Sequence, residues 1–325
     1  MVRSSGHRKN LRRRCGRWAL LLVVVVLFVP VVIRQLFPPE RRQFEWAVLD
    51  HSRYSEITFH NEAQGLDFGG MLFRPAGDGP FPAVVIIHGS GTSHRANGWY
   101  LTLTHHLQNN GIAVLLPDKR GSEKSEGDWR SAGFQDLATD TLAALALLQE
   151  RPDIDAARVG VVGMSQGGWI APIVADRNRE LAFIVSIVGS SVTPREQLLY
   201  EENYNIRQLG FLPGISNLLA YAGSANVRYL AQPYLYNLIA DYDPLPYWRN
   251  VTIESLVLLG ADDTNVPSAE SARRLRNLDN PNIRVIVYRG SGHALESPLG
   301  QGNAIIRQDA LETVSDFILN WIVPY

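Results

Sequence analysis

Residues 163–167, Gly-Met-Ser-Gln-Gly, place Ser165 in the G-x-S-x-G pattern of a serine nucleophile. The pattern is informative only where a strand enters it and a helix leaves it, because the sharp turn between them strains the serine backbone and exposes its hydroxyl. Both conditions hold here. Residues 158–163 form a short apolar run typical of a buried strand, and residues 169–174 continue as an apolar helix. The sequence therefore predicts that Ser165 is a catalytic nucleophile.

Two other segments carry a family resemblance. Residues 88–91 read His-Gly-Ser-Gly, and residues 118–121 read Asp-Lys-Arg-Gly. Together with the serine motif they resemble the α/β-hydrolase superfamily over roughly residues 55–325, close to bacterial serine esterases and to prolyl-oligopeptidase-type and aminopeptidase-type hydrolases. The resemblance implies a catalytic order of nucleophile, acid and histidine along the chain.

The resemblance also implies an acid in a pattern like G-x-x-D-x-x-V-P after a late strand. Residues 260–267, Gly-Ala-Asp-Asp-Thr-Asn-Val-Pro, fit it with Asp263. Asp262 is one residue out of register and stays as the alternative. The histidine should lie in the loop after the last strand, where Gly290-Ser-Gly-His293 occurs. Of the eight histidines, only His293 combines a glycine-flanked loop with a preceding strand and a following helix.

These residue types suit acyl transfer. A neutral imidazole, whose pKa is near ~6.5, takes the proton from a serine hydroxyl at neutral pH, and a carboxylate holds the imidazole in the right tautomer. The oxyanion of the tetrahedral intermediate needs donors, and the resemblance assigns them to the backbone N–H groups of Gln166 and Ser90. His88 resembles a family histidine that shapes the oxyanion loop, which is a structural role.

The rest of the chain supplies elements to position these residues. Two strand-like pieces, at 55–60 and 66–74, are separated by a glycine-containing turn and predict an antiparallel opening. Six short apolar runs follow, at 83–88, 112–117, 158–163, 183–188, 256–260 and 283–288. Helical periodicity lies between the later runs, clearest at 135–149, 268–278 and 303–321. This alternation predicts an α/β fold with a mostly parallel sheet and helices on both faces.

Residues 194–250 interrupt the alternation. They are rich in tyrosine, mostly helical in pattern, and inserted between the sixth and seventh apolar runs that follow residue 55. We predict a helical cap over the site, with an ordinary helical excursion as the alternative. Within it, Glu201 and Glu202 are interpreted as a solvated helix face, or else as a pair that holds the amino group of a peptide substrate.

Charge is distributed unevenly. Residues 1–42 hold ten Lys and Arg against one acid, whereas the remainder holds 21 basic and 31 acidic residues. An acidic folded part argues against nucleic-acid binding. The single cysteine, Cys15, excludes an internal disulfide framework and a cysteine-based metal site, and no motif calls for a metal or organic cofactor.

The N-terminal region predicts membrane attachment. Residues 18–33 are uninterrupted apolar sequence between arginines, and Leu36 and Phe37 extend the run. A cleavable signal peptide is the alternative, but no small-residue cleavage site follows before Ala47. We expect a basic cytoplasmic segment at 1–17, a single-pass signal anchor at 18–37, a linker at 38–54, and an extracytoplasmic hydrolase domain at 55–325.

The sequence therefore predicts a membrane-anchored serine hydrolase that cleaves carboxylic esters through Ser165, His293 and Asp263, without a cofactor or metal. A serine peptidase is the nearest alternative, so the expected substrate is a small ester or a short peptide. A non-catalytic binding protein on the same fold is the alternative of another class. Neither the acyl group nor the oligomeric state follows from the sequence.

Overall fold

A computed structural model describes residues 53–297 and 305–320, together with isolated positions between 14 and 49. Its centre is an eight-stranded sheet of order β1-β2-β4-β3-β5-β6-β7-β8. Only β2 runs antiparallel to its neighbours, and every other pairing in the sheet is parallel. The strands are β1 Ser55–Asn61, β2 Leu66–Phe73, β3 Phe81–Ile87, β4 Ala113–Pro117, β5 Ile154–Met164, β6 Ile184–Ile187, β7 Ser255–Gly260 and β8 Ile283–Tyr288.

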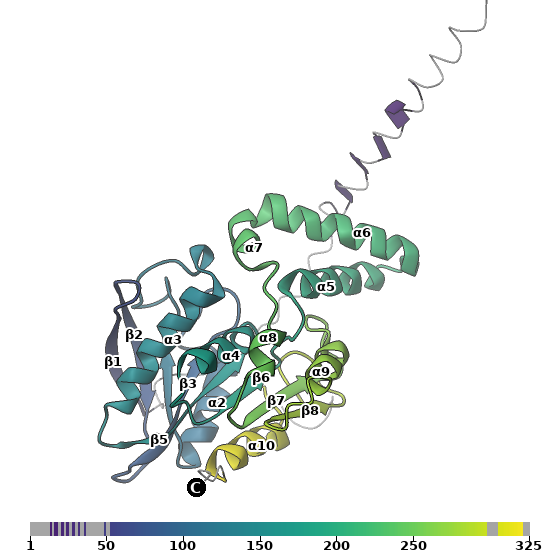
Figure 1. Ribbon diagram of the computed structural model, residues 1–325. Helices are drawn as coiled ribbons and strands as arrows, with labels where there is room; N and C mark the ends of the chain where they lie inside the picture. The colour runs from purple at the N-terminus through teal and green to yellow at the C-terminus, as the bar shows by residue number, and fades with distance from the viewer. Residues whose placement is uncertain are drawn as a thin grey trace, which may run out of the picture.

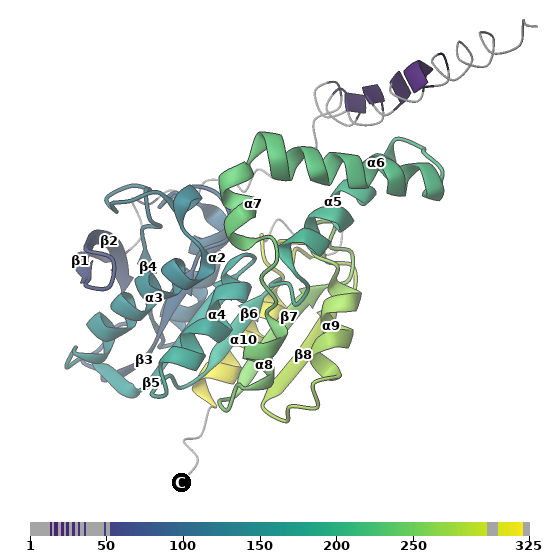
Figure 2. The same ribbon diagram turned by 45° about the horizontal axis from the view of Figure 1, so that its top comes forward.

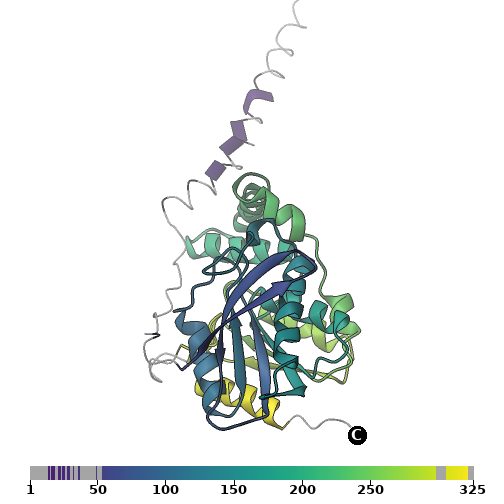
Figure 3. The same cartoon turned by 90° about the vertical axis from the view of Figure 1, so that its left-hand side faces the viewer.

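Helices cover both faces of the sheet (Figures 1 and 3). Helices α3, α4, α8 and α9 pack on one face, and α2 and α10 pack on the other. The central strands β3 and β5 are buried on both faces, which explains their continuous apolar sequence. These elements are α2 Gly98–Asn109, α3 Phe134–Gln149, α4 Gly167–Arg177, α8 Leu245–Arg249, α9 Ser268–Arg276 and α10 Gln308–Leu319, with a 3₁₀ turn at Trp129–Ser131.

The segment between β6 and β7 forms a layer of helices beyond one end of the sheet (Figure 2). It begins with α5, where Thr193 and Glu196 cap the N-terminus reciprocally and Pro194 occupies the first turn. The layer contains α5 Pro194–Gln208, α6 Pro213–Asn226, a π-helical turn Val227–Ala231 and α7 Pro233–Ile239. We call these helices the cap.

The α/β architecture predicted from the sequence is confirmed, including the antiparallel opening, and helices α5 to α8 lie within residues 194–250. Several element ends differ from the prediction, and one helix is missing from it. Strand β5 begins at Ile154 rather than Arg158, because its first residue pairs with Phe81 before a register irregularity. Helix α2 was not predicted, because the face that it buries carries threonine and tyrosine as well as leucine and so lacks a clear apolar period.

The predicted anchor at 18–37 falls mostly outside the described residues, as does much of the linker at 38–54. The described positions between 14 and 36 are helical. Among the described residues, no helix has both the length and the apolar character needed to span a bilayer.

Candidate active site

Ser165 lies on the sharp turn between β5 and α4. Its φ is 53°, in the left-handed region that side chains other than glycine rarely adopt, and its N–H donates to the Ile187 carbonyl at 2.9 Å. A Cβ atom on Gly167 would lie 2.2 Å from the Ile87 carbonyl oxygen, so the turn closes only with glycine there. The sequence therefore holds the Ser165 hydroxyl out from the carboxyl edge of the sheet, in a strained backbone geometry.

The structure brings Ser165, His293 and Asp263 together in the predicted arrangement. The Ser165 Oγ is 2.9 Å from His293 Nε2, and His293 Nδ1 is 2.7 Å from Asp263 Oδ2. Both His293 and Asp263 are buried, whereas Ser165 is partly accessible. A buried carboxylate, an imidazole and a partly exposed hydroxyl thus form one continuous relay of hydrogen bonds.

The carboxylate of Asp263 is fixed by its own turn. Its Oδ1 accepts the backbone N–H groups of Asn265 at 2.8 Å and of Val266 at 2.9 Å, which leaves Oδ2 for His293. Asp262 is exposed, and its N–H donates to the Ser291 carbonyl at 2.9 Å. Of the two aspartates that the sequence left open, Asp263 is the one beside the imidazole.

Close backbone contact holds the acid turn against the histidine loop. A Cβ atom on Gly260 would lie 2.2 Å from the Gly292 carbonyl oxygen, so this approach also requires glycine. The indole of Trp99, at the start of α2, donates to the Ala294 carbonyl at 3.2 Å, and its ring lies 6.0 Å from the His293 ring. The loop that carries His293 is thereby supported by the end of β7 and by α2.

The predicted oxyanion donors lie on two sides of Ser165. Within the described residues, the backbone N–H groups of Ser90 and Gln166 have no hydrogen-bond partner. The neighbouring Gly89 N–H is occupied by the Tyr100 hydroxyl at 2.9 Å, and a Cβ atom on Gly89 would lie 3.3 Å from the Ser165 Cβ. The loop after β3 therefore approaches the nucleophile closely and leaves the Ser90 N–H open.

Lys119 is a buried cation beside this loop, and the sequence analysis did not single it out. Its Nζ donates to the Gly89 carbonyl at 2.6 Å and to the Gln166 Oε1 at 3.0 Å, and lies 5.0 Å from the centre of the Trp129 ring. Because a trans peptide is planar, its C=O and N–H point in opposite directions. By holding the Gly89 carbonyl, Lys119 aims the Ser90 N–H away from itself.

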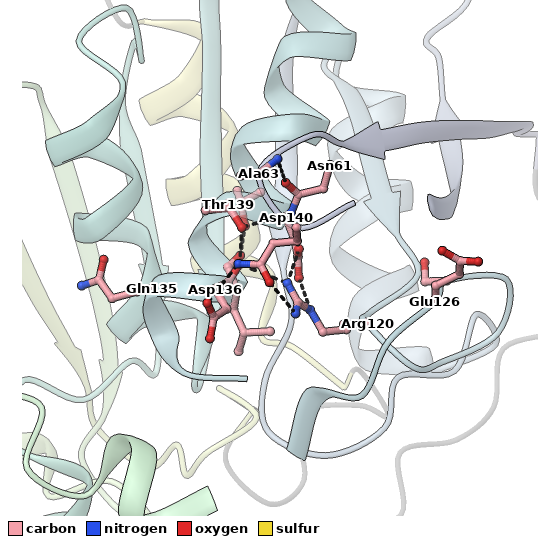
Figure 4. Close-up of polar contacts among 12 residues, drawn as sticks. Asn61, Ala63, Arg120, Glu126, Gln135, Asp136, Thr139 and Asp140 are labelled. Atoms are coloured by element: carbon pink, nitrogen blue, oxygen red, sulfur yellow. Dashed lines mark hydrogen bonds and ion pairs between the residues drawn. The ribbon is translucent and has the colours of Figure 1, made fainter. Parts of the chain in front are cut away.

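Two ion pairs fix the segment on either side of Lys119. The carboxylate of Asp118 accepts hydrogen bonds from Nε and Nη2 of Arg95, at 2.8 and 2.7 Å. Arg120 donates to both carboxylate oxygens of Asp140 on α3, at 2.9 and 2.7 Å (Figure 4). Burial lowers the pKa of Lys119 to about 7. The only sequence signal for this residue was its place in the Asp-Lys-Arg-Gly motif directly after a buried strand.

The remaining polar residues of interest have structural surroundings. His88 is buried with its Nε2 2.6 Å from the Pro117 carbonyl, and burial lowers its pKa to about 4, so it is neutral at physiological pH. Glu202 is buried within the cap, so the interpretation of Glu201 and Glu202 as a solvated helix face is wrong for Glu202, because α5 turns that position inward. No cluster of three or more potential metal ligands occurs in the described part of the chain.

Two protein families match the chain. The BAAT / Acyl-CoA thioester hydrolase C terminal family matches residues 143–306, and the Dienelactone hydrolase family matches residues 68–208. The first match spans half of the chain and contains Ser165, Asp263 and His293, whereas the second contains Ser90 and Ser165.

Individual relatives include an esterase and an acylamino-acid-releasing enzyme. Esterase EstD of Thermotoga maritima is 26% identical, over 78% of this chain and 65% of its own length. The acylamino-acid-releasing enzyme of Sus scrofa is 26% identical over 86% of this chain but only 41% of its own length. The chain thus spans less than two thirds of each of these relatives.

Solved structures share the fold. An esterase from Pyrococcus furiosus, Pf2001, superposes with a TM-score of 0.62 at 19% identity, covering 88% of this chain and 98% of its own. Est1E from Butyrivibrio proteoclasticus, solved with ferulic acid bound, gives a TM-score of 0.55 at 18% identity, covering 83% of this chain and 99% of its own. At these identities the likeness establishes the architecture alone.

Proposed function

We propose that this chain cleaves carboxylic esters through an acyl-enzyme. It belongs to the BAAT / Acyl-CoA thioester hydrolase C terminal family and is an esterase-like serine hydrolase of the α/β-hydrolase fold. One observation supports this proposal most strongly. The hydrogen bonds from Ser165 Oγ to His293 Nε2 and from His293 Nδ1 to Asp263 Oδ2 supply a nucleophile, a base and an orienting acid in reacting order.

In the proposed first half-reaction, the Ser165 Oγ attacks the ester carbonyl carbon while His293 Nε2 takes the hydroxyl proton. The carbonyl oxygen becomes an oxyanion, which the N–H groups of Ser90 and Gln166 stabilise. The intermediate then collapses, the bond to the leaving oxygen breaks, and His293 gives the proton to the departing alcohol.

In the second half-reaction, water takes the place of the alcohol. His293 removes a proton from the water, the hydroxide attacks the acyl-enzyme, and collapse of the second intermediate returns the proton to Ser165 and releases the carboxylic acid. Throughout both steps Asp263 stabilises the imidazolium, and its two backbone donors hold its carboxylate in place.

The proposal extends to the location of the protein. A basic segment, an apolar run at 18–37 and a linker to 54 support a signal anchor, with the N-terminus in the cytoplasm and the catalytic domain outside. This assignment rests on the sequence, and protease protection of the intact chain in membrane vesicles of known orientation tests it.

A fluorophosphonate probe tests the chemistry. We expect the probe to label Ser165 in the folded wild-type chain and to leave Ser165→Ala unlabelled, and we expect Ser165→Ala to lose turnover of short p-nitrophenyl esters. A folded wild-type sample that neither reacts with the probe nor cleaves any ester would overturn the proposal and favour a non-catalytic binding protein.

Peptide cleavage is the second candidate function. The similarity to acylamino-acid-releasing enzymes over 86% of this chain favours it. Aminoacyl and N-acyl-aminoacyl arylamides discriminate the two, because an esterase leaves them intact while it cleaves the matched esters. Turnover of the arylamides at rates comparable with the esters would move the assignment to a peptidase.

A further inference from the structure

Large apolar side chains are exposed in only two regions of the described chain, apart from Leu319. One region is the set of described positions between 18 and 36, and the other is residues 200–238 of the cap. In the cap these side chains lie on α5, on the loop between α5 and α6, on α6, on the turn after it and on α7. We call six of these exposed residues the cap face: Leu212, Ile215, Leu218, Tyr221, Leu230 and Tyr234.

Helix α6 exposes its large apolar side chains and buries its small ones, the reverse of a helix that faces water. The side buried against α5 carries mostly small residues, including Ser216, Ala220 and Gly223. The outward side carries Leu218 and Tyr221, which are 55% and 63% exposed. A water-facing helix buries its large apolar residues and exposes its polar ones, so this arrangement indicates that the outward side meets an apolar medium.

The cap face is also depleted in charge. Arg228 is the only charged residue between positions 211 and 240. It is mostly buried, and its guanidinium lies over the Tyr229 ring and near Asp241. Water-exposed surfaces usually carry abundant charge, whereas surfaces in contact with lipid exclude it.

The N-terminal apolar region contacts the cap. Val29 packs against the cluster of Ile206, Leu219 and Ala220, where α5 meets α6. In Figures 1 and 2 the described positions near the N-terminus lie beyond α6, on the side away from the sheet. A surface that continues into an apolar stretch preceded by arginines matches a lipid bilayer with anionic head groups. The exposed tyrosines suit its interfacial zone.

The cap face and the site lie on opposite sides of the same helical layer. The hydroxyl of Tyr200 on α5 donates to the Asp263 carbonyl at 2.9 Å, so the inner side of the cap rests on the loop that carries the proposed acid. A substrate dissolved in lipid at the cap face would therefore be separated from the loop that carries the proposed acid by this helical layer.

We propose that the cap face is a bilayer-contact surface and that the enzyme takes acyl esters dissolved in the membrane as substrates. The substrate part rests on the proposed function, whereas the contact itself does not. The cap face lies in the interfacial zone of the bilayer, and the site opens beneath it.

Site-specific fluorescence tests the contact in the full-length chain. In a Cys15→Ser background, the variants Leu230→Cys and Tyr234→Cys are labelled with an environment-sensitive fluorophore and reconstituted in vesicles of phosphatidylcholine and phosphatidylglycerol. The control is Glu62→Cys, because the Glu62 side chain is 94% exposed on the turn between β1 and β2. We expect spin-labelled lipids to quench the labels at 230 and 234, and aqueous iodide to quench the label at 62.

Equal access of iodide to all three labels, with no quenching by lipid, overturns the proposal. Shielding of the labels at 230 and 234 that depends on protein concentration and persists in detergent without lipid also overturns it, since a second copy would then cover the face.

Activity tests the substrate class. The double variant Leu230→Glu with Tyr234→Glu should keep wild-type turnover of a soluble short-chain ester, and lose turnover of a long-chain ester held in the vesicles by on the order of tenfold. Equal loss or equal retention of both activities overturns the substrate part. A wild-type chain that cleaves neither ester refutes the proposed function instead, and the quenching result still decides whether the cap face contacts lipid.

Discussion

Replacing Lys119 by methionine tests whether this buried cation orients the oxyanion donors. Methionine keeps an apolar stem beside Trp129 but removes the ammonium that lies 2.6 Å from the Gly89 carbonyl. A hydrogen bond to a charged group contributes about 1.5–3 kcal/mol. Complete loss of one oxyanion donor raises the barrier by about 2.7–4 kcal/mol. We therefore expect kcat to fall by about ten- to a thousandfold, with KM nearly unchanged.

Stability separates this role from a general structural one. The lowered pKa of Lys119 shows that burial disfavours its charged form, so an apolar replacement should leave the free energy of unfolding unchanged or raise it. The assay measures kcat and KM on a short p-nitrophenyl ester, together with the urea midpoint. The matched control is Lys124→Met, whose side chain is 60% exposed and pairs with Glu56, and which should behave as wild type. An unchanged kcat in Lys119→Met, or a slower rate explained by a lower urea midpoint, would refute the reasoning.

Three more predictions follow from the same geometry. Asp263→Asn should lower kcat by on the order of 10⁴-fold, because the amide favours the wrong imidazole tautomer. Asp262→Asn should change kcat little. A larger loss of kcat in Asp262→Asn than in Asp263→Asn would assign the acid to Asp262. Gly167→Ala should lower the melting temperature markedly, because the new Cβ would lie 2.2 Å from the Ile87 carbonyl oxygen. The control Gly214→Ala on α6, where a Cβ meets nothing within 4 Å, should not lower it. Equal melting temperatures of the two variants would contradict this account. The pKa of Lys119 falls from 10.5 to about 7 on folding, so the unfolded chain binds more protons between these values and the wild-type free energy of unfolding should rise with pH across that window. Urea titrations at several pH values in wild type and Lys119→Met check this, and identical slopes in the two proteins would count against it.

Local patterns were sufficient to predict the sheet and the elbow. Parallel strands buried on both faces need continuous apolar sequence, so β3 and β5 were visible as short runs without any tertiary information. The glycine after Ser165 is required by close backbone packing, because no larger residue fits beside the Ile87 carbonyl. The apolar pattern acts within one element. The glycine contact joins α4 to β3, and the G-x-S-x-G motif makes it visible in the sequence.

The choice between Asp263 and Asp262 as the acid beside His293 depended on tertiary structure. Adjacent residues in a turn point in different directions, and the direction toward His293 is set by the contact between Gly260 and Gly292. Family register favoured Asp263, but only the assembled loops place its Oδ2 2.7 Å from the imidazole.

What the sequence by itself determined is therefore the α/β architecture, the serine elbow and the chain order of the proposed nucleophile, acid and histidine. Tertiary structure alone decided that Lys119 is buried and that the large apolar residues of α6 are exposed. In the sequence Lys119 resembles an ordinary surface cation, but in the structure ion pairs of the neighbouring Asp118 and Arg120 with distant elements hold it beside Gly89. Helix α6 resembles an ordinary helix in the sequence, but its small residues pack on α5 and its large ones face outward. The physical reason is that periodicity specifies which residues share a face, whereas burial depends on what the rest of the chain brings against that face.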